Sequence, residues 1–291
     1  MNAPMRLPAL IAAAVALLAA CSAHAEPPVW VIRDADSTIT LFGSVHILPK
    51  GQDWQPEALK RAIAGADDLW FEVPFDDASR QASGETLVRR GMLLEGQSLT
   101  AIMAPADVER LRRIAPGLGQ PVAYFDRMAP WLADVFISQL YVSAHGGDLQ
   151  AGVEEVLNHQ APPGARRRAF ETADQQISTL ADAPRADQLA SLAETLRSIE
   201  EEPGDFDAIV GQWMRGDTAG LIHEALDPLQ KTAPGMYERL IRARNAAWVP
   251  IIRDRLAGSG DTVMVVGVGH LVGPDSVPAI LRARGIRVDG P

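Results

Sequence analysis

The sequence predicts an α/β fold, with α+β as the alternative, in which a mixed sheet is built from N- and C-terminal βαβ units around a large central helical insert. Two observations lead to this prediction. A run rich in β-branched residues, typical of a buried strand, ends in Gly-x-x-His near each end of the chain, at His46 and at His270. Between these runs, over about residues 76–255, apolar residues recur mainly at helical spacing.

The first 25 residues have the composition of an export signal. Arg6 provides the positive start, and an apolar stretch too short for a membrane span and then small residues follow it. Two processing sites fit this segment: an ordinary signal peptidase site after Ala25, and a bacterial lipobox that would place a lipid on Cys21. We therefore expect a periplasmic or secreted protein, or an outer-membrane lipoprotein that contacts the membrane only through Cys21.

Composition limits the function of the remaining chain, residues 26–291, which we expect to form a single domain. The formal net charge is -10, and an acidic protein is a poor partner for nucleic acid, which requires a basic face. The sequence contains one cysteine, Cys21, so an internal disulfide and a thiolate metal site are both excluded.

The N-terminal unit reads as a β-hairpin followed by a helix and a further strand. Pro56 suits the first turn of the helix, and one carboxylate, Glu72, interrupts the last strand. A crossover through a helix makes that strand parallel to the one before His46, so Glu72 and His46 should lie near the same edge of the sheet. The expected elements span residues 29–32, 37–42, 56–66 and 69–73.

The central insert is expected to be mainly helical, and the C-terminal unit repeats the order of the N-terminal one. Three consecutive arginines, at 166–168, are interpreted as a solvated face. The tryptophans of the insert are interpreted as core residues; they include Trp131, Trp213 and Trp248. Helices are predicted near residues 106–114, 128–144, 186–202 and 237–256, and the closing unit comprises a strand at 262–266, a helix around 278–281 and a strand at 286–288.

The two histidines that follow the strands are candidates for a metal site. In α/β sheets ligands bind at the edge where strand ends and loops converge. Imidazole and carboxylate are the usual ligands of zinc and related divalent ions, so His46, Glu72 and His270 form a possible ligand set. The alternatives are structural: each histidine could be a satisfied polar residue, and Glu72 could pair with an arginine.

Common hydrolase and nucleotide motifs are absent. The segment 267–269, Gly-Val-Gly, could suggest a phosphate-binding loop, but it lacks the lysine of a P-loop and the third glycine of a dinucleotide fingerprint. The sequence contains neither a Gly-x-Ser-x-Gly elbow nor a His-Glu-x-x-His pair. A site assembled from distant strand ends therefore remains.

The two Gly-x-x-His motifs, at 43–46 and 267–270, and Glu72 between them resemble the motifs of the TraB/GumN family, which includes the Tiki metalloproteases. The resemblance implies an α/β core related to erythromycin esterase and to haem-binding ChaN-like proteins. It also implies a metal-dependent hydrolytic site, since Tiki members cleave peptides with manganese or cobalt. Where many relatives have Gly-x-Asp, this chain has Glu154. The matching segments are 43–46, 71–72, 130–132, 152–154, 170–176, 213–217, 238–240, 244–245 and 266–273.

Two functions follow from this combination of residues and resemblance. The first is an exported metallohydrolase, a peptidase or an enzyme of small molecules, in which a divalent ion (Mn, Co or Zn) activates water. Glu171 or Glu154 is then the candidate general base, and Arg244 stabilises the oxyanion unless it forms a buried ion pair with one of those glutamates. The second is a non-catalytic periplasmic protein that binds haem, metal or peptide. No histidine stands out as an axial haem ligand, so the sequence does not favour haem.

Overall fold

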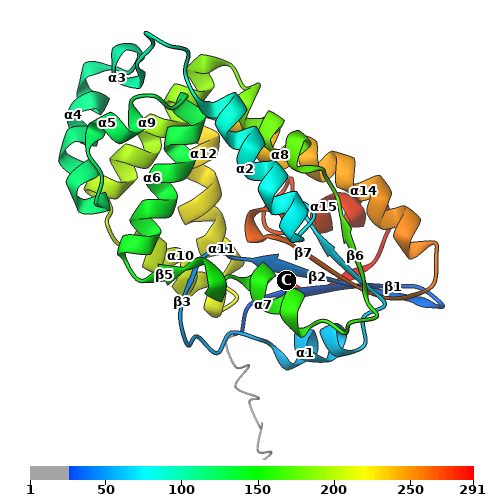
Figure 1. Ribbon diagram of the computed structural model, residues 1–291. Helices are drawn as coiled ribbons and strands as arrows, with labels where there is room; N and C mark the ends of the chain where they lie inside the picture. The colour runs from blue at the N-terminus through cyan, green and yellow to red at the C-terminus, as the bar shows by residue number, and fades with distance from the viewer. Residues whose placement is uncertain (1–25) are drawn as a thin grey trace, which may run out of the picture.

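The computed structural model describes residues 26–291, which form a sheet flanked by helices and a cluster of helices over one end of that sheet (Figure 1). The predicted export signal, with Cys21, lies outside the described residues. In the part of the chain that is described, no helix combines the length and the apolar character needed to cross a membrane.

The main sheet has the strand order β6-β4-β7-β2-β1-β8, and only β1 runs antiparallel to its neighbours. The predicted mixed α/β architecture is therefore confirmed. A separate two-stranded ribbon, β3–β5, joins the loop after His46 to the end of helix α6. The strands are β1 (Val29–Arg33), β2 (Ser37–Ser44), β3 (Leu48–Pro49), β4 (Asp68–Phe71), β5 (Gly147–Asp148), β6 (Arg166–Ala169), β7 (Gly260–Gly267) and β8 (Val288–Asp289).

The two βαβ units interleave. Strand β7 of the C-terminal unit lies between β2 and β4 of the N-terminal unit, and β2 and β1 lie between β7 and β8. All of β2 pairs in parallel with β7, with Ser44 opposite Gly267 at their ends. The segments that carry His46 and His270 therefore leave the sheet side by side, at the edge where β4 delivers Glu72.

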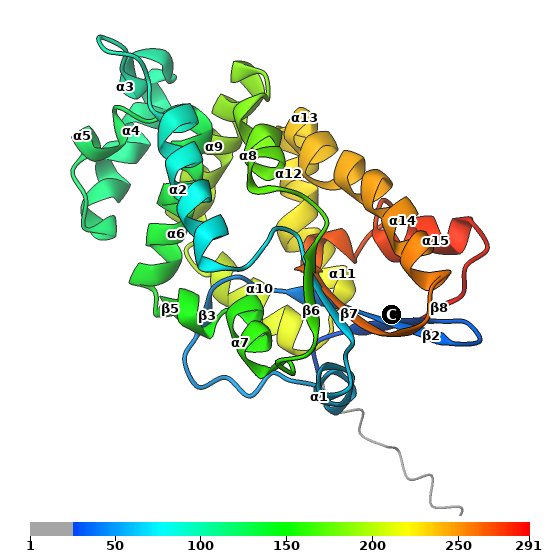
Figure 2. The ribbon, with the colours of Figure 1, turned by 45° about the vertical axis from the view of Figure 1, so that its right-hand side comes forward.

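Helices cover both faces of the sheet. Helix α1 (Glu57–Ala64) lies on one face, and α14 (Ala243–Leu256) and α15 (Val277–Ala283) lie on the other (Figure 2). Leu59 and Ile63 of α1 are buried in the sheet core, together with nearly all of β2 and the middle of β7. Strands buried on both sides read as continuous apolar runs, which is why these two were recognisable in the sequence.

The insert forms a second hydrophobic core within the helical cluster. Trp131 belongs to this core, whereas Trp213 and Trp248 belong to the sheet core, so the prediction that all three are core residues is confirmed. The helices of the insert before α14 are α2 (Asp77–Gly91), α3 (Leu99–Ile102), α4 (Pro105–Ile114), α5 (Val122–Phe125), α6 (Pro130–Ala144), α7 (Val153–Gln160), α8 (Ala173–Ala181), α9 (Arg185–Glu201), α10 (Asp205–Met214), α11 (Thr218–Leu221), α12 (Asp227–Thr232) and α13 (Pro234–Tyr237). Short 3-10 turns occupy Ala115–Leu118 and Leu149–Ala151, and π-helical turns occupy Ile222–Leu226 and Glu238–Arg242.

One strand of the main sheet was not anticipated. The arginine run interpreted as a solvated face is the edge strand β6, parallel to β4. All three arginines are exposed, as a solvated face requires, but Arg166 and Arg168 also donate to the carboxylate of Asp68, which is 1% exposed. A run of three charged residues lacks the apolar–polar alternation by which a strand is recognised in a sequence. The strand conformation of residues 166–169 is explained by their pairing with β4.

Candidate functional site

The site begins where β2 and β7 end. After β7, the chain forms a short 3-10 turn, Val268–His270, that passes over the end of β2. Gly43 makes this possible, because a Cβ at that position would lie 2.8 Å from Cγ2 of Val268. The carbonyl of Gly43 also accepts a 2.8 Å hydrogen bond from the indole of Trp213. The glycine of the first Gly-x-x-His motif thus gives space to the second motif.

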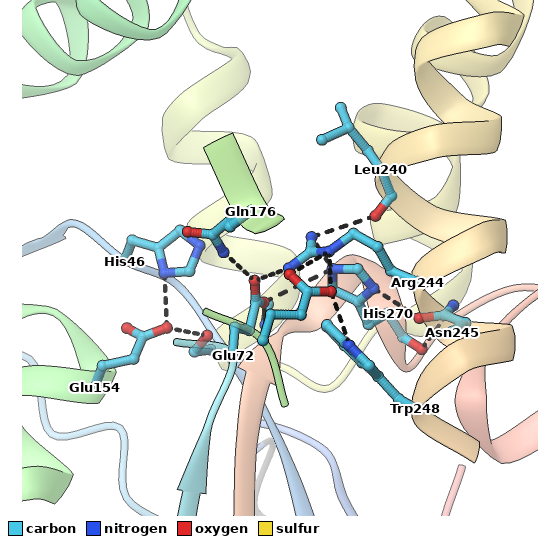
Figure 3. A network of polar contacts seen from close by, with 12 residues as sticks. His46, Glu72, Glu154, Gln176, Leu240, Arg244, Asn245, Trp248 and His270 are labelled. Carbon is cyan, nitrogen blue, oxygen red and sulfur yellow. Dashed lines mark hydrogen bonds and ion pairs between the residues drawn. The ribbon is translucent and has the colours of Figure 1, made fainter. Parts of the chain in front are cut away.

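His46 is held by a carboxylate from helix α7. Its Nδ1 donates to Oε1 of Glu154 at 2.6 Å, and the hydroxyl of Ser44 donates to the same oxygen at 2.5 Å (Figure 3). Gly152 lets α7 start against this loop, because a Cβ there would collide with the carbonyl of His46. The carboxylate of Glu154 raises the pKa of His46 to about 9. The imidazole side chain is 62% exposed, so this histidine lies at the mouth of the site.

His270 is the buried member of the pair, with a side chain that is 6% exposed. Its Nδ1 lies 2.7 Å from Oδ1 of Asn245, and the amide nitrogen of Asn245 donates to the carbonyl of Asp275 at 2.8 Å. The amide oxygen can only accept, so Nδ1 carries the proton and Nε2 has the free lone pair. Burial lowers the pKa of His270 to about 4, which keeps the ring neutral near pH 7.

Glu72 lies between the two histidines and is almost fully buried (Figure 3). Oε1 accepts the backbone N–H of Gly267 at 2.7 Å and lies 3.7 Å from Nε2 of His270. Oε2 accepts from Arg244 at 2.6 Å and from Gln176 at 3.0 Å. Burial opposes ionisation of this carboxyl, but His270, Arg244 and His46 together hold its pKa well below the usual range.

Arg244 links Glu72 to a second carboxylate. Its Nε donates to both oxygens of Glu171, at 2.9 and 3.2 Å, and Trp248 donates to Oε1 of Glu171 at 2.9 Å. The guanidinium also lies 4.8 Å from the centre of the Trp248 ring, and Nη1 lies 3.1 Å from Nε2 of His270. The sequence left two roles open for Arg244, and one of them was a buried ion pair with a glutamate. The structure contains such a pair, with Glu171.

The three candidate metal ligands face one small space above Gly267. A Cβ at Gly267 would lie within 4 Å of all of them: 3.3 Å from Oε1 of Glu72, 3.7 Å from Cδ2 of His270 and 3.8 Å from Nε2 of His46. Within residues 26–291, no three His, Cys, Asp or Glu side chains are already grouped closely enough to hold an ion. The chemistry of the donors nevertheless fits a divalent ion, because Nδ1 of each histidine is bound to an acceptor. Nε2 of His46, which must lose its proton to bind an ion, lies toward this space, whereas Nε2 of His270 faces Nη1 of Arg244 at 3.1 Å.

A cavity of about 590 Å³ adjoins this space. His46, Glu72, Glu154 and Gln176 line it, together with Phe71 and Phe75. Glu171 lines a different cavity, beside Arg244 and Trp248. Of the two candidate general bases, Glu154 alone borders the cavity that contains His46 and Glu72.

The structure brings all six predicted site residues to one end of the sheet, in two bonded groups. One group is His46 with Glu154, and the other is Glu72 with Arg244, Glu171 and His270. Sequence reasoning did not assign roles to Ser44, Gln176 or Asn245, which hold Glu154, Glu72 and His270 in place. The available signal was position: Ser44 lies within the first Gly-x-x-His motif, and Asn245 directly follows Arg244 after a π-helical turn, a feature frequent at functional sites.

Comparisons with known proteins agree with the arrangement of motifs. The TraB/PrgY/gumN family profile matches residues 28–290. An uncharacterized protein of Treponema pallidum (strain Nichols) is 24% identical over 277 residues, which cover 90% of this chain and 82% of that protein. No solved structure matches the chain.

Proposed function

Because the chain belongs to the TraB/PrgY/gumN family, we propose that it is an exported metal-dependent hydrolase, and specifically a peptidase. One observation carries the proposal. Two imidazoles from neighbouring strand ends, each with Nδ1 engaged by an acceptor, border the same small space as a buried carboxylate oxygen, and Nε2 of His46 lies at that space. Histidine ligands of catalytic metals are typically oriented by such outer hydrogen bonds.

His46, Glu72 and His270 would hold the ion, with manganese, cobalt and zinc as the candidates. Three protein ligands are the usual number for a catalytic ion, because a further position must remain open for water or substrate. When bound, a divalent ion supplies Lewis-acid activation of water and of the scissile carbonyl. Nη1 of Arg244 lies 3.1 Å from Nε2 of His270, so this contact would have to open for His270 to hold an ion.

The other polar residues of the site have distinct roles in this proposal. Glu154 orients His46 and borders the cavity, so it is the group placed to accept a proton. Glu171 is a positioning residue, because both of its oxygens are occupied by Arg244. Arg244 fixes Glu72, and once released from His270 its Nη1 is a donor for negative charge that develops on substrate.

Metal binding and hydrolysis test the proposal separately. Protein purified without chelators is examined by elemental analysis, and Mn, Co and Zn affinities are measured by calorimetry for the wild type, His46→Ala and His270→Ala. We expect each substitution to abolish tight binding. The same proteins are then assayed on a peptide library with and without metal, and Glu72→Gln is expected to lose metal-stimulated cleavage. Full metal affinity in either histidine variant would exclude that histidine as a ligand.

Export is part of this proposal and depends on residues 1–25 of the sequence. Two processed forms are considered, one cleaved after Ala25 and one lipidated at Cys21. Palmitate labelling of wild type and Cys21→Ala distinguishes them, because only the lipidated form gives a label that the substitution removes.

A further inference from the structure

A second cavity lies beside the candidate site, between the sheet edge and the helical cluster. Its volume is about 570 Å³, and it shares His46 and Leu149 with the cavity that contains Glu72. Helices α6 and α9 provide much of its wall, and they run side by side in the helical cluster (Figure 1). Any group bound here would lie next to His46.

The walls of this second cavity are mainly apolar. The side chains include Val135, Val142, Leu180, Phe206 and Leu240. Val135 is 37% exposed and Leu149 is 48% exposed, although both are large hydrophobic residues. Such exposure beside a proposed site is typical of a surface that binds a ligand.

Asp134 of α6 is the one acidic side chain among the residues that line this cavity. Its Oδ2 accepts a 2.6 Å hydrogen bond from the hydroxyl of Ser191 on α9. Burial raises the pKa of this carboxyl, and no charged neighbour in residues 26–291 contributes to the shift. Asp68 and Glu72 are buried and Glu171 is half-buried, but each of these is paired with arginine. Among residues 26–291, Asp134 is therefore a half-buried carboxylate at an apolar cavity for which no ion pair with a cationic side chain is formed.

An apolar cavity with one carboxylate favours a ligand that is both apolar and positively charged. A long aliphatic stem with a cationic end satisfies both parts, because the stem covers the walls and the cation pairs with the acid. A purely apolar side chain would cover the carboxylate without pairing it. We propose that this cavity receives a lysine or arginine side chain of the peptide substrate, whose cationic end binds Asp134. This inference rests on the proposed function only in taking a peptide as the substrate.

The experiment measures peptide binding without hydrolysis. Eight-residue fluorescent peptides carry lysine at one position in turn, and a matched set carries norleucine, which has an uncharged stem. Anisotropy in EDTA gives the affinity of each pair for wild type, Asp134→Asn and Asp205→Asn. Asp205 is the matched control, because it accepts the same 2.6 Å hydrogen bond, from Ser198, in a neighbouring cavity.

For at least one position we expect wild type and Asp205→Asn to prefer lysine over norleucine by roughly tenfold or more, as a charged hydrogen bond allows. Asp134→Asn should reduce that ratio to about one. The inference is overturned if norleucine binds as well as lysine at every position, if Asp134→Asn keeps the preference, or if no peptide binds. Metal-stimulated cleavage is measured separately. A protein that binds lysine peptides but hydrolyses none would contradict the proposed hydrolase function and leave the inference about Asp134 standing.

Discussion

Glu154 and His46, which are far apart in the sequence, share a 2.6 Å hydrogen bond that ties helix α7 to the loop after β2. The carboxylate accepts a hydrogen bond from the Nδ1–H of His46, so Nε2 is the ring nitrogen that faces Glu72 and His270. Glu154 therefore controls both the orientation and the charge of the exposed histidine.

Glu154→Gln is expected to lower the pKa of His46 in the metal-free protein from about 9 toward its ordinary value of 6.5, because the substitution removes the charge that stabilises the imidazolium. Proton NMR titration of the ring measures this directly. Glu155→Gln removes a neighbouring charge but leaves the hydrogen bond to His46, and should change the pKa little. A value that stays near 9 without Glu154 would mean that another carboxylate sets it.

Arg244→Met is expected to destabilise the metal-free protein by about 3–5 kcal/mol, since it leaves Glu72 and Glu171 buried without their cation. Urea unfolding in EDTA measures the loss. Arg242→Met is the matched control on the same helical segment. This 53% exposed arginine pairs with Glu238 and Asp275 at the surface, and its loss should cost less than about 1 kcal/mol. Equal losses in the two variants would contradict a structural role for the buried guanidinium.

The main elements of the fold were predictable because their signals are local. Strands β2 and β7 are apolar runs, and α1 has a clear apolar stripe, so all three were identified within a few residues. The edge strand β6 was missed because its arginines become intelligible only beside Asp68. The interleaving of the two βαβ units could not be predicted, because the spacing of apolar residues does not indicate which parallel strands are neighbours in the sheet.

Some residues of the candidate site could likewise be predicted from local sequence, and others could not. His46 and His270 were predictable from their strand ends, and parallel pairing of β2 with β7 brings them together. The contacts that distinguish Glu154 from Glu171 were not predictable, because they depend on which side of Glu72 each insert helix approaches. Asn245 could be noticed only as the neighbour of Arg244, and its bond to His270 requires the packed helix.

Asp68→Asn is expected to make stability less dependent on acid pH. The guanidinium of Arg166, with that of Arg168, holds the pKa of Asp68 well below its ordinary 3.8 in the folded state. A lowered folded pKa gives stability that is fully present above the unfolded value and is lost as pH falls through the folded value. The difference between wild type and Asp68→Asn, about 3 kcal/mol at pH 6, should therefore shrink steadily below about pH 4. Urea titrations from pH 6 to about pH 2.5 measure it, and a constant difference would contradict the pairing.

Gly267→Ala tests the metal proposal without altering a ligand. The backbone at Gly267, with φ -49° and ψ 135°, is open to alanine, so folding should be nearly unaffected. The added methyl group would occupy the space between Glu72, His270 and His46, at 3.3–3.8 Å from their nearest atoms. An ion held there would be excluded, and we expect affinity for Mn, Co and Zn to fall by at least about 100-fold, the upper range for losses caused by residues around a metal.

Calorimetry with each metal gives the affinity of Gly267→Ala, and thermal unfolding in EDTA shows whether the fold is kept. Gly269→Ala is the control, because its methyl group would contact Leu226 and Ile241 rather than the three ligand groups. The pair separates two explanations that histidine substitutions confound, since both alanine variants keep every imidazole and carboxylate. Unchanged metal affinity in Gly267→Ala would place the ion elsewhere, whereas equal losses in both variants would trace the effect to the turn that carries His270.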